Sequence, residues 1–153
     1  MLIFVKHLKS LGDKYMQHSY QREAVVSSSE MKNKYETEYP AYQPDPVVAI
    51  RLKSLIKDKK VTIVLGQWCS DSQIQVPRFY KILDDAGVND DAINVICVDK
   101  MKKAENGLID NLHIEQVPTF IFTQNNREIG RITEQPITTL ENDMVILLEK
   151  NIL

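Results

Sequence analysis

The most informative segment of the sequence is LGQWCSDSQIQVPRFY, residues 65 to 80. It starts where the apolar run VTIVL ends, and Trp68 and Cys69 follow directly. A short apolar run rich in β-branched residues is typical of a strand that is buried on both faces. After the cysteine, apolar residues recur at helical spacing from Val76 to Leu83. The stretch therefore predicts a cysteine at a strand-to-helix junction.

The chain on both sides of this junction alternates between helical and strand patterns. Asp45 can cap a helix that starts at Pro46, and the tripeptide Gln-Asn-Asn before Arg127 joins the last two strands as a hairpin. Such an alternation predicts a mainly parallel sheet covered on both faces, with one antiparallel edge. The predicted helices are 46–58, the segment from Cys69 to Gly87, 104–112 and 140–148, and the predicted strands are 61–65, 93–98, 119–123 and 127–132.

The first 45 residues are predicted to form an extension that packs on a domain comprising residues 46–153. Residues 1–25 have loosely helical apolar spacing, whereas prolines 40, 44 and 46 favour an extended segment over residues 26–46. The tyrosines at 35, 39 and 42 favour an ordered arm, since disordered segments are poor in aromatic residues. A loose tail is the alternative.

Composition excludes several classes of protein. With 153 residues, 43% of them hydrophobic and 26% charged, the chain is an ordinary globular domain. The net charge of −2 gives no basic patch for nucleic acid or a membrane surface, and no apolar run approaches a membrane span. We read no export signal and expect a cytoplasmic protein. Three scattered histidines and two distant cysteines have no metal-ligand spacing, and we expect no cofactor.

These features together resemble the thioredoxin superfamily over roughly residues 47–150. The resemblance rests on Trp68-Cys69 after a buried strand, on Pro77 in the following helix and on Val117-Pro118-Thr119 before the third strand. It implies an α/β thioredoxin-like fold with a central mixed sheet flanked by helices. It also implies a cis peptide bond at Pro118, in a loop that faces Cys69.

The segment WCSDSQIQVPRFYKILD resembles more narrowly a thioredoxin-like group with Cys-x-Asp-Ser in place of Cys-x-x-Cys. That group also has a lead-in rich in tyrosine and proline, such as PAYQPDP here. Ser72 stands where a thioredoxin has its second cysteine, and Ile63 stands where a thioredoxin buries an aspartate. Both differences affect the step that resolves a mixed disulfide, so the resemblance implies a monothiol protein.

The predicted catalytic residues are Cys69 and Ser72. Unpaired N–H groups at a helix N-terminus favour a cysteine thiolate, and the Ser72 hydroxyl could donate a hydrogen bond to the sulfur. Cys97 lies within the apolar run INVICV and is predicted to be an inert core thiol. The predicted substrate-binding residues are Trp68, Asp71, Val117, Pro118 and Thr119.

The leading functional hypothesis is a monothiol thiol-disulfide oxidoreductase. Its substrate would be a protein that contains a disulfide or a thiol capped by a small molecule. Cys69 would form a mixed disulfide, and a low-molecular-weight thiol or a reductase would release it. The alternative is a non-catalytic thioredoxin-fold module that binds an extended peptide or protein in the same groove.

Overall fold

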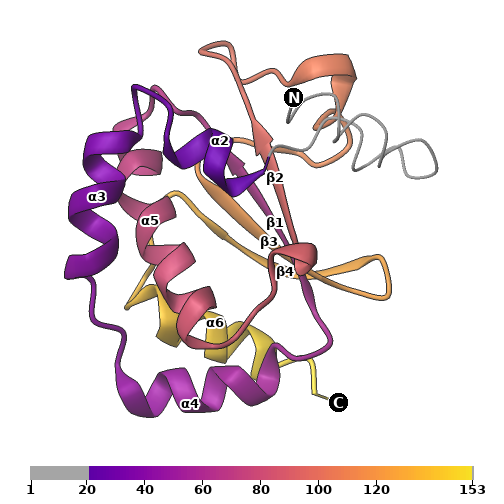
Figure 1. Ribbon diagram of the computed structural model, residues 1–153. Coiled ribbons are helices and arrows are strands. Elements are labelled where there is room, and N and C mark those ends of the chain that lie inside the picture. The colour runs from indigo at the N-terminus through magenta and orange to yellow at the C-terminus, as the bar shows by residue number, and fades with distance from the viewer. Residues whose placement is uncertain (1–20, 153) are drawn as a thin grey trace.

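A computed structural model describes residues 21–152 as a four-stranded mixed sheet with helices packed against it (Figure 1). The strands are β1 (Lys60–Leu65), β2 (Ile93–Cys97), β3 (Thr119–Gln124) and β4 (Arg127–Thr133). Their order is β2-β1-β3-β4, with β1 parallel to β2 and both other pairs antiparallel. The predicted mixed sheet and all four strand positions are confirmed, whereas the expectation of a mainly parallel sheet is wrong.

The connection between β2 and β3 lacks the helix predicted over residues 104–112. It contains a single turn of 3-10 helix, η4 (Glu105–Gly107), in which Gly107 has a left-handed φ of 65°. Upstream of it, the Asp99 carboxylate accepts hydrogen bonds from the backbone N–H groups of Met101 and Lys103. These local turns compete with helix formation, so the segment stays irregular.

The other three predicted helices form and start where the sequence suggests, although the first of them ends at Leu55 and not near residue 58. Helix α4 (Pro46–Leu55) is capped by the Asp45 carboxylate, and α6 (Leu140–Glu149) is capped by the Thr139 hydroxyl. Helix α5 (Ser70–Asp85) starts directly after Cys69 and ends before Gly87, which has a φ of 74°. A second short 3-10 helix, η3 (Asp90–Ala92), precedes β2.

Helices α2 (Arg22–Val26) and α3 (Lys32–Ala41) occupy most of residues 21–45, the described part of the predicted extension. The prediction of an extended chain over residues 26–46 is therefore wrong, although Pro40 does lie in the last turn of α3. Helix α3 lies beside α5 (Figure 1). Its Tyr35 and Tyr39 pack on the main core, and this packing overrides the local preference of proline. Predictions for residues 1–20 lie outside the described residues.

Hydrogen bonds and ion pairs join the segment 21–45 to α5 and α6. The Arg22 guanidinium stacks 4.1 Å from the centroid of the Tyr80 ring and donates to both Asp84 carboxylate oxygens at 2.9 and 2.7 Å. The Tyr42 hydroxyl and the Asp45 backbone N–H both donate to the Glu141 carboxylate, at 2.6 and 2.9 Å. Since Glu141 is only 2% exposed, these two donors satisfy a buried charge.

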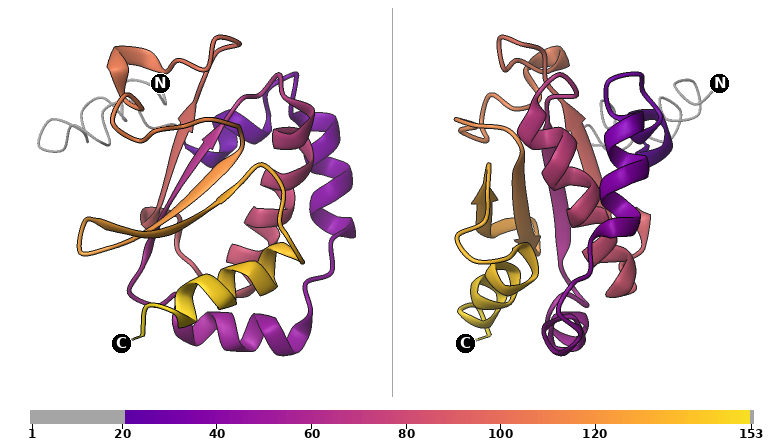
Figure 2. Two further views of the ribbon diagram at one scale, coloured as in Figure 1. Left: turned by 180° about the vertical axis from the view of Figure 1, so that it is seen from behind. Right: turned by 90° about the vertical axis from the view of Figure 1, so that its left-hand side faces the viewer.

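The two faces of the sheet are covered differently. Residues of α2, α4, α5 and α6 form one continuous apolar core with one face, in which Phe79 stacks on Phe120 at a centroid distance of 4.0 Å. The other face has a smaller cluster, beneath the irregular segment between β2 and β3 that loops past one end of the sheet (Figure 2). Among residues 21–152, no helix is both long and apolar enough to cross a bilayer.

Candidate functional site

Cys69 lies at the N-cap of α5, after a tight turn that follows the end of β1 at Leu65. Its backbone N–H donates to the Gly66 carbonyl at 2.9 Å, which closes a tight turn between strand and helix. Its side chain is partly buried, and its thiol donates to the Val117 carbonyl oxygen at 3.5 Å. The sulfur therefore lies between the first turn of a 16-residue helix, whose free N–H groups favour anions, and the Val117-Pro118 loop.

Trp68 forms one wall beside the cysteine. Its indole N–H donates to the Val98 carbonyl oxygen at 3.0 Å, and its ring packs on the smaller apolar cluster. A Cβ atom on Gly66 would come within 2.6 Å of the ring atom Cε2. Glycine at position 66 therefore lets the indole lie flat against the β1–α5 turn.

Ser72 is fully buried, and its hydroxyl oxygen accepts a hydrogen bond from the Gly66 N–H at 3.2 Å. The sequence predicted that the Ser72 hydroxyl donates a hydrogen bond to the Cys69 sulfur. In the structure, the hydrogen-bond partner of this hydroxyl is the Gly66 N–H instead. The reason is geometric: position 72 is in the first turn of α5, where the side chain turns back onto the loop that enters the helix. Ser72 thus braces the turn that carries Cys69.

The loop opposite the cysteine has the predicted cis peptide bond between Val117 and Pro118. The Val117 side chain is buried in the smaller cluster, while its carbonyl oxygen is directed at the Cys69 thiol. Thr119 opens β3, pairs with Val64 and Thr133, and donates its hydroxyl hydrogen to the Gln116 carbonyl oxygen at 2.6 Å. These contacts fix the loop at the edge of the site.

Asp71 connects the first turn of α5 to the chain that follows β4. Its carboxylate accepts a hydrogen bond from the Gln135 side-chain amide at 3.1 Å. Gln135 was not among the site residues that the sequence predicted. The only clue in the sequence is its position shortly after the last strand, and the contact joins residues 64 positions apart.

Cys97 lies on the other face of the sheet from Cys69. Alternation along β2 directs Ile96 and Val98 into the smaller cluster, which Cys69 contacts, and directs Cys97 toward the main core. Neither cysteine is in a disulfide, and Cys97 is partly rather than fully buried. Cys97 thus packs on the main core, as the prediction of a core thiol requires, but it stays partly exposed as the last residue of its strand.

The interior next to the site is apolar. Ile63 is fully buried in the main core at the position where a thioredoxin would have an aspartate. Among the described residues, no three histidine, cysteine, aspartate or glutamate side chains gather so that they could hold a metal ion. What the site presents is one thiol, an indole, a helix N-terminus and a backbone loop.

Comparisons with known proteins show the fold. No protein-family model and no curated protein matches the sequence. Among solved structures, the chain is similar to PA1234, a protein of unknown function from Pseudomonas aeruginosa, with a TM-score of 0.61 and 16% identity over 86% of this chain and 93% of that chain. It is equally similar to an HIV epitope scaffold, with a TM-score of 0.61 and 15% identity over 90% and 87% of the two chains.

Thioredoxins are also among the similar structures. The germline-specific thioredoxin Deadhead from Drosophila melanogaster has a TM-score of 0.44 and 15% identity, covering 67% of this chain and 90% of that one. The element order, the mixed sheet and the cysteine at the start of α5 opposite a cis-proline loop make this an α/β thioredoxin-like fold.

Proposed function

We propose that the protein is a monothiol thiol-disulfide oxidoreductase in which Cys69 is the reacting group. The observation that supports this most directly is the position of the Cys69 sulfur, at the start of α5 and 3.5 Å from the Val117 carbonyl oxygen. A thiol held there lies at a helix N-terminus, whose unpaired backbone N–H groups can stabilise the negative charge that develops on sulfur during disulfide exchange.

The reaction has two exchange steps. The Cys69 thiolate attacks one sulfur of a disulfide R–S–S–R′, so that a Cys69–S–S–R bond forms and R′–S⁻ leaves and takes up a proton. An external thiolate R″–S⁻ then attacks the R sulfur, so that R–S–S–R″ forms and Cys69 leaves as thiolate. Cys69 is oxidised in the first step and reduced in the second.

An external thiol is required because the described part of the chain offers no second thiol near Cys69. Ser72 occupies the helical position one turn later, and Cys97 is directed to the opposite face of the sheet. Substrates would therefore be proteins with a disulfide or a thiol capped by a small molecule. Release by a low-molecular-weight thiol or a reductase suits a reducing compartment such as the cytoplasm.

The other site residues would bind the substrate. Trp68 offers an apolar wall beside the sulfur, and the Val117 backbone in the cis-proline loop could pair with an extended peptide. In the unliganded protein, the Val117 carbonyl oxygen accepts from the Cys69 thiol. Loss of the thiol proton would free this acceptor for a peptide N–H.

Intact mass after incubation with oxidised glutathione tests the proposal. The wild-type protein and the Cys97→Ser variant should each gain one glutathione. Over the same incubation time, the Cys69→Ser variant should gain none. Modification of Cys97 in place of Cys69, or no adduct on either cysteine, would contradict the proposal and favour a binding module.

A further inference from the structure

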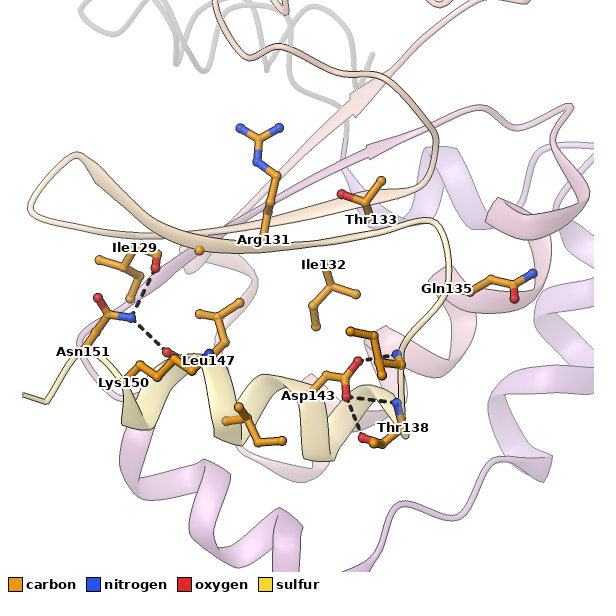
Figure 3. Close-up of a pocket in the computed structure, with 13 residues that line it drawn as sticks. Ile129, Arg131, Ile132, Thr133, Gln135, Thr138, Asp143, Leu147, Lys150 and Asn151 are labelled. Carbon is orange, nitrogen blue, oxygen red and sulfur yellow. Dashed lines mark hydrogen bonds between the residues drawn. The ribbon is translucent and has the colours of Figure 1, made fainter.

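A cavity of about 560 Å³ lies between β4 and α6, within the size range of ligand sites (Figure 3). Its apolar lining comes from Ile129, Ile132, Ile137, Ile146 and Leu147. Two of these side chains are unusually open to water, since Ile137 is 95% exposed and Ile146 is 44% exposed. Exposed apolar side chains that border one cavity indicate a site for an apolar group.

The polar groups of this cavity are largely satisfied by the protein itself. The Asp143 carboxylate accepts from the backbone N–H groups of Ile137 and Thr138 at 2.6 and 3.1 Å, and from the Thr138 hydroxyl (Figure 3). The Asn151 amide donates to the carbonyl oxygens of Ile129 and Leu147 at 3.2 and 2.9 Å. What remains for a ligand is therefore mainly apolar surface.

One residue connects the cavity to the Cys69 site. Gln135 lines the cavity, points toward α5 and donates to the Asp71 carboxylate, two positions after Cys69 (Figure 3). The cationic Lys150 lies at the other end of the cavity from Gln135. A ligand that extends from Cys69 past Gln135 would thus contact the apolar lining of the cavity and then, at its far end, the ammonium group of Lys150.

We infer that this cavity is a second binding subsite, which takes an apolar side chain of the polypeptide that reacts at Cys69, with an acidic residue of that polypeptide next to Lys150. The inference rests on the function proposed above and adds a class of substrate to it. A polypeptide fits better than a small molecule, because the two places are neighbours only through the Gln135–Asp71 contact, and an extended chain that advances about 3.3 Å per residue can continue from one to the other. Its side chain, rather than its backbone, would fill the cavity, because Asn151 already covers the Ile129 carbonyl of edge strand β4.

Peptides with one cysteine bound to glutathione test the inference. Each peptide has a Leu-Glu pair placed three, five or seven residues from the cysteine, and a matched series has Ser-Gln there. The readout is the second-order rate constant for glutathione transfer to Cys69, followed by intact mass. At the best spacing, the Leu-Glu peptide should react about tenfold faster than its Ser-Gln counterpart, as burial of one apolar side chain allows.

Two variants assign this preference to the cavity. Ile137→Glu places a charge at the rim of the cavity and should remove the preference for the Leu-Glu peptide. Ile50→Glu is the matched control, because Ile50 lies on α4, is 73% exposed and does not line the cavity. Both variants should react with oxidised glutathione as the wild-type protein does. Equal rates for both peptide series at every spacing, or the same loss in Ile50→Glu, would overturn the inference.

A failure of the proposed function would be visible separately. If Cys69 reacts with no disulfide at all, the chemistry is wrong, and the cavity is then tested by anisotropy of a fluorescein-labelled Leu-Glu peptide. Weaker binding to Ile137→Glu than to Ile50→Glu would support the subsite even then, and equal binding would overturn it.

Discussion

Gly66 has no side chain at the point where the Trp68 indole crosses the β1–α5 turn. The same glycine accepts from the Cys69 N–H through its carbonyl and donates through its own N–H to Ser72. One small residue thus connects three of the residues that make up the site. The sequence pattern showed the cysteine but gave no reason to consider the glycine, because its role depends on a contact with a ring two residues away.

Replacing Gly66 by alanine should displace the indole. The new Cβ would approach ring atoms at 2.6 Å, so Trp68 must move and lose its hydrogen bond to Val98. We expect a loss of about 1 to 2 kcal/mol in the free energy of unfolding, as overpacking usually costs. Trp68 is the only tryptophan in the chain, so its fluorescence should also shift to longer wavelength.

A matched control for this change is Ser70→Ala, at an exposed neighbouring position. It should leave the emission spectrum unchanged. An unchanged spectrum in Gly66→Ala as well would mean that the indole does not lie against the turn.

At the scale of elements, the sequence predicted those parts whose signals are local. The strands β1 and β2 are continuous apolar runs, and the hairpin turn has Asn125 and Asn126, both with φ above 50°, a conformation that asparagine tolerates. Helix α3 was missed because Pro40 signals a break, while the contacts that stabilise the helix lie on α5, far along the chain. Gln135 was missed for the same reason.

The ion pair between α2 and α5 sets a pH dependence. Burial alone raises the pKa of the Asp84 carboxyl, but hydrogen bonds from Arg22 and Tyr39 outweigh burial and leave the pKa below its usual value. A carboxyl with a lower pKa in the folded state contributes its full stabilisation above the unfolded pKa of about 3.9. That stabilisation is lost as the pH falls through the folded pKa.

Arg22→Gln should therefore destabilise the protein by roughly 1 to 2 kcal/mol at pH 7, since the pair is only partly buried. In urea denaturation, the difference from wild type should shrink below about pH 4 as Asp84 becomes protonated. The same substitution in an Asp84→Asn background should cost less at pH 7. An equal cost in both backgrounds would show that Arg22 acts through its stacking on Tyr80 or its ion pair with Asp90, and not through the Asp84 carboxylate.

In the whole molecule, the segment 21–45 lies on the outer side of α5. It adds Tyr35, Tyr39 and Tyr42 to the surface of the main core, and it supplies the two donors to the buried Glu141 carboxylate. Its removal would expose apolar surface and leave a buried charge without hydrogen bonds. The segment therefore matters to stability although it lies away from Cys69.

Deletion of residues 1–45 should lower the melting temperature by several degrees, since about 1 kcal/mol corresponds to roughly 2 to 4 °C in a domain of this size. Deletion of residues 1–20 alone is the comparison that isolates the contribution of α2, α3 and the following linker. Two results together would show that the segment is a loose tail. These are full retention of stability after the longer deletion, and fast amide exchange throughout residues 35–46 of the full-length protein.

The lifetime of the Cys69 mixed disulfide shows whether Cys69 acts without a resolving thiol. The Cys69–glutathione adduct is prepared in a Cys97→Ser background, freed of excess reagent and followed by intact mass with and without added glutathione. The adduct should persist without thiol and disappear at a rate proportional to added thiol. Ser72→Cys should release glutathione without any addition, because it provides an attacking thiol at high effective concentration. Spontaneous loss from the protein with Ser72, at a rate independent of added thiol, would contradict the account.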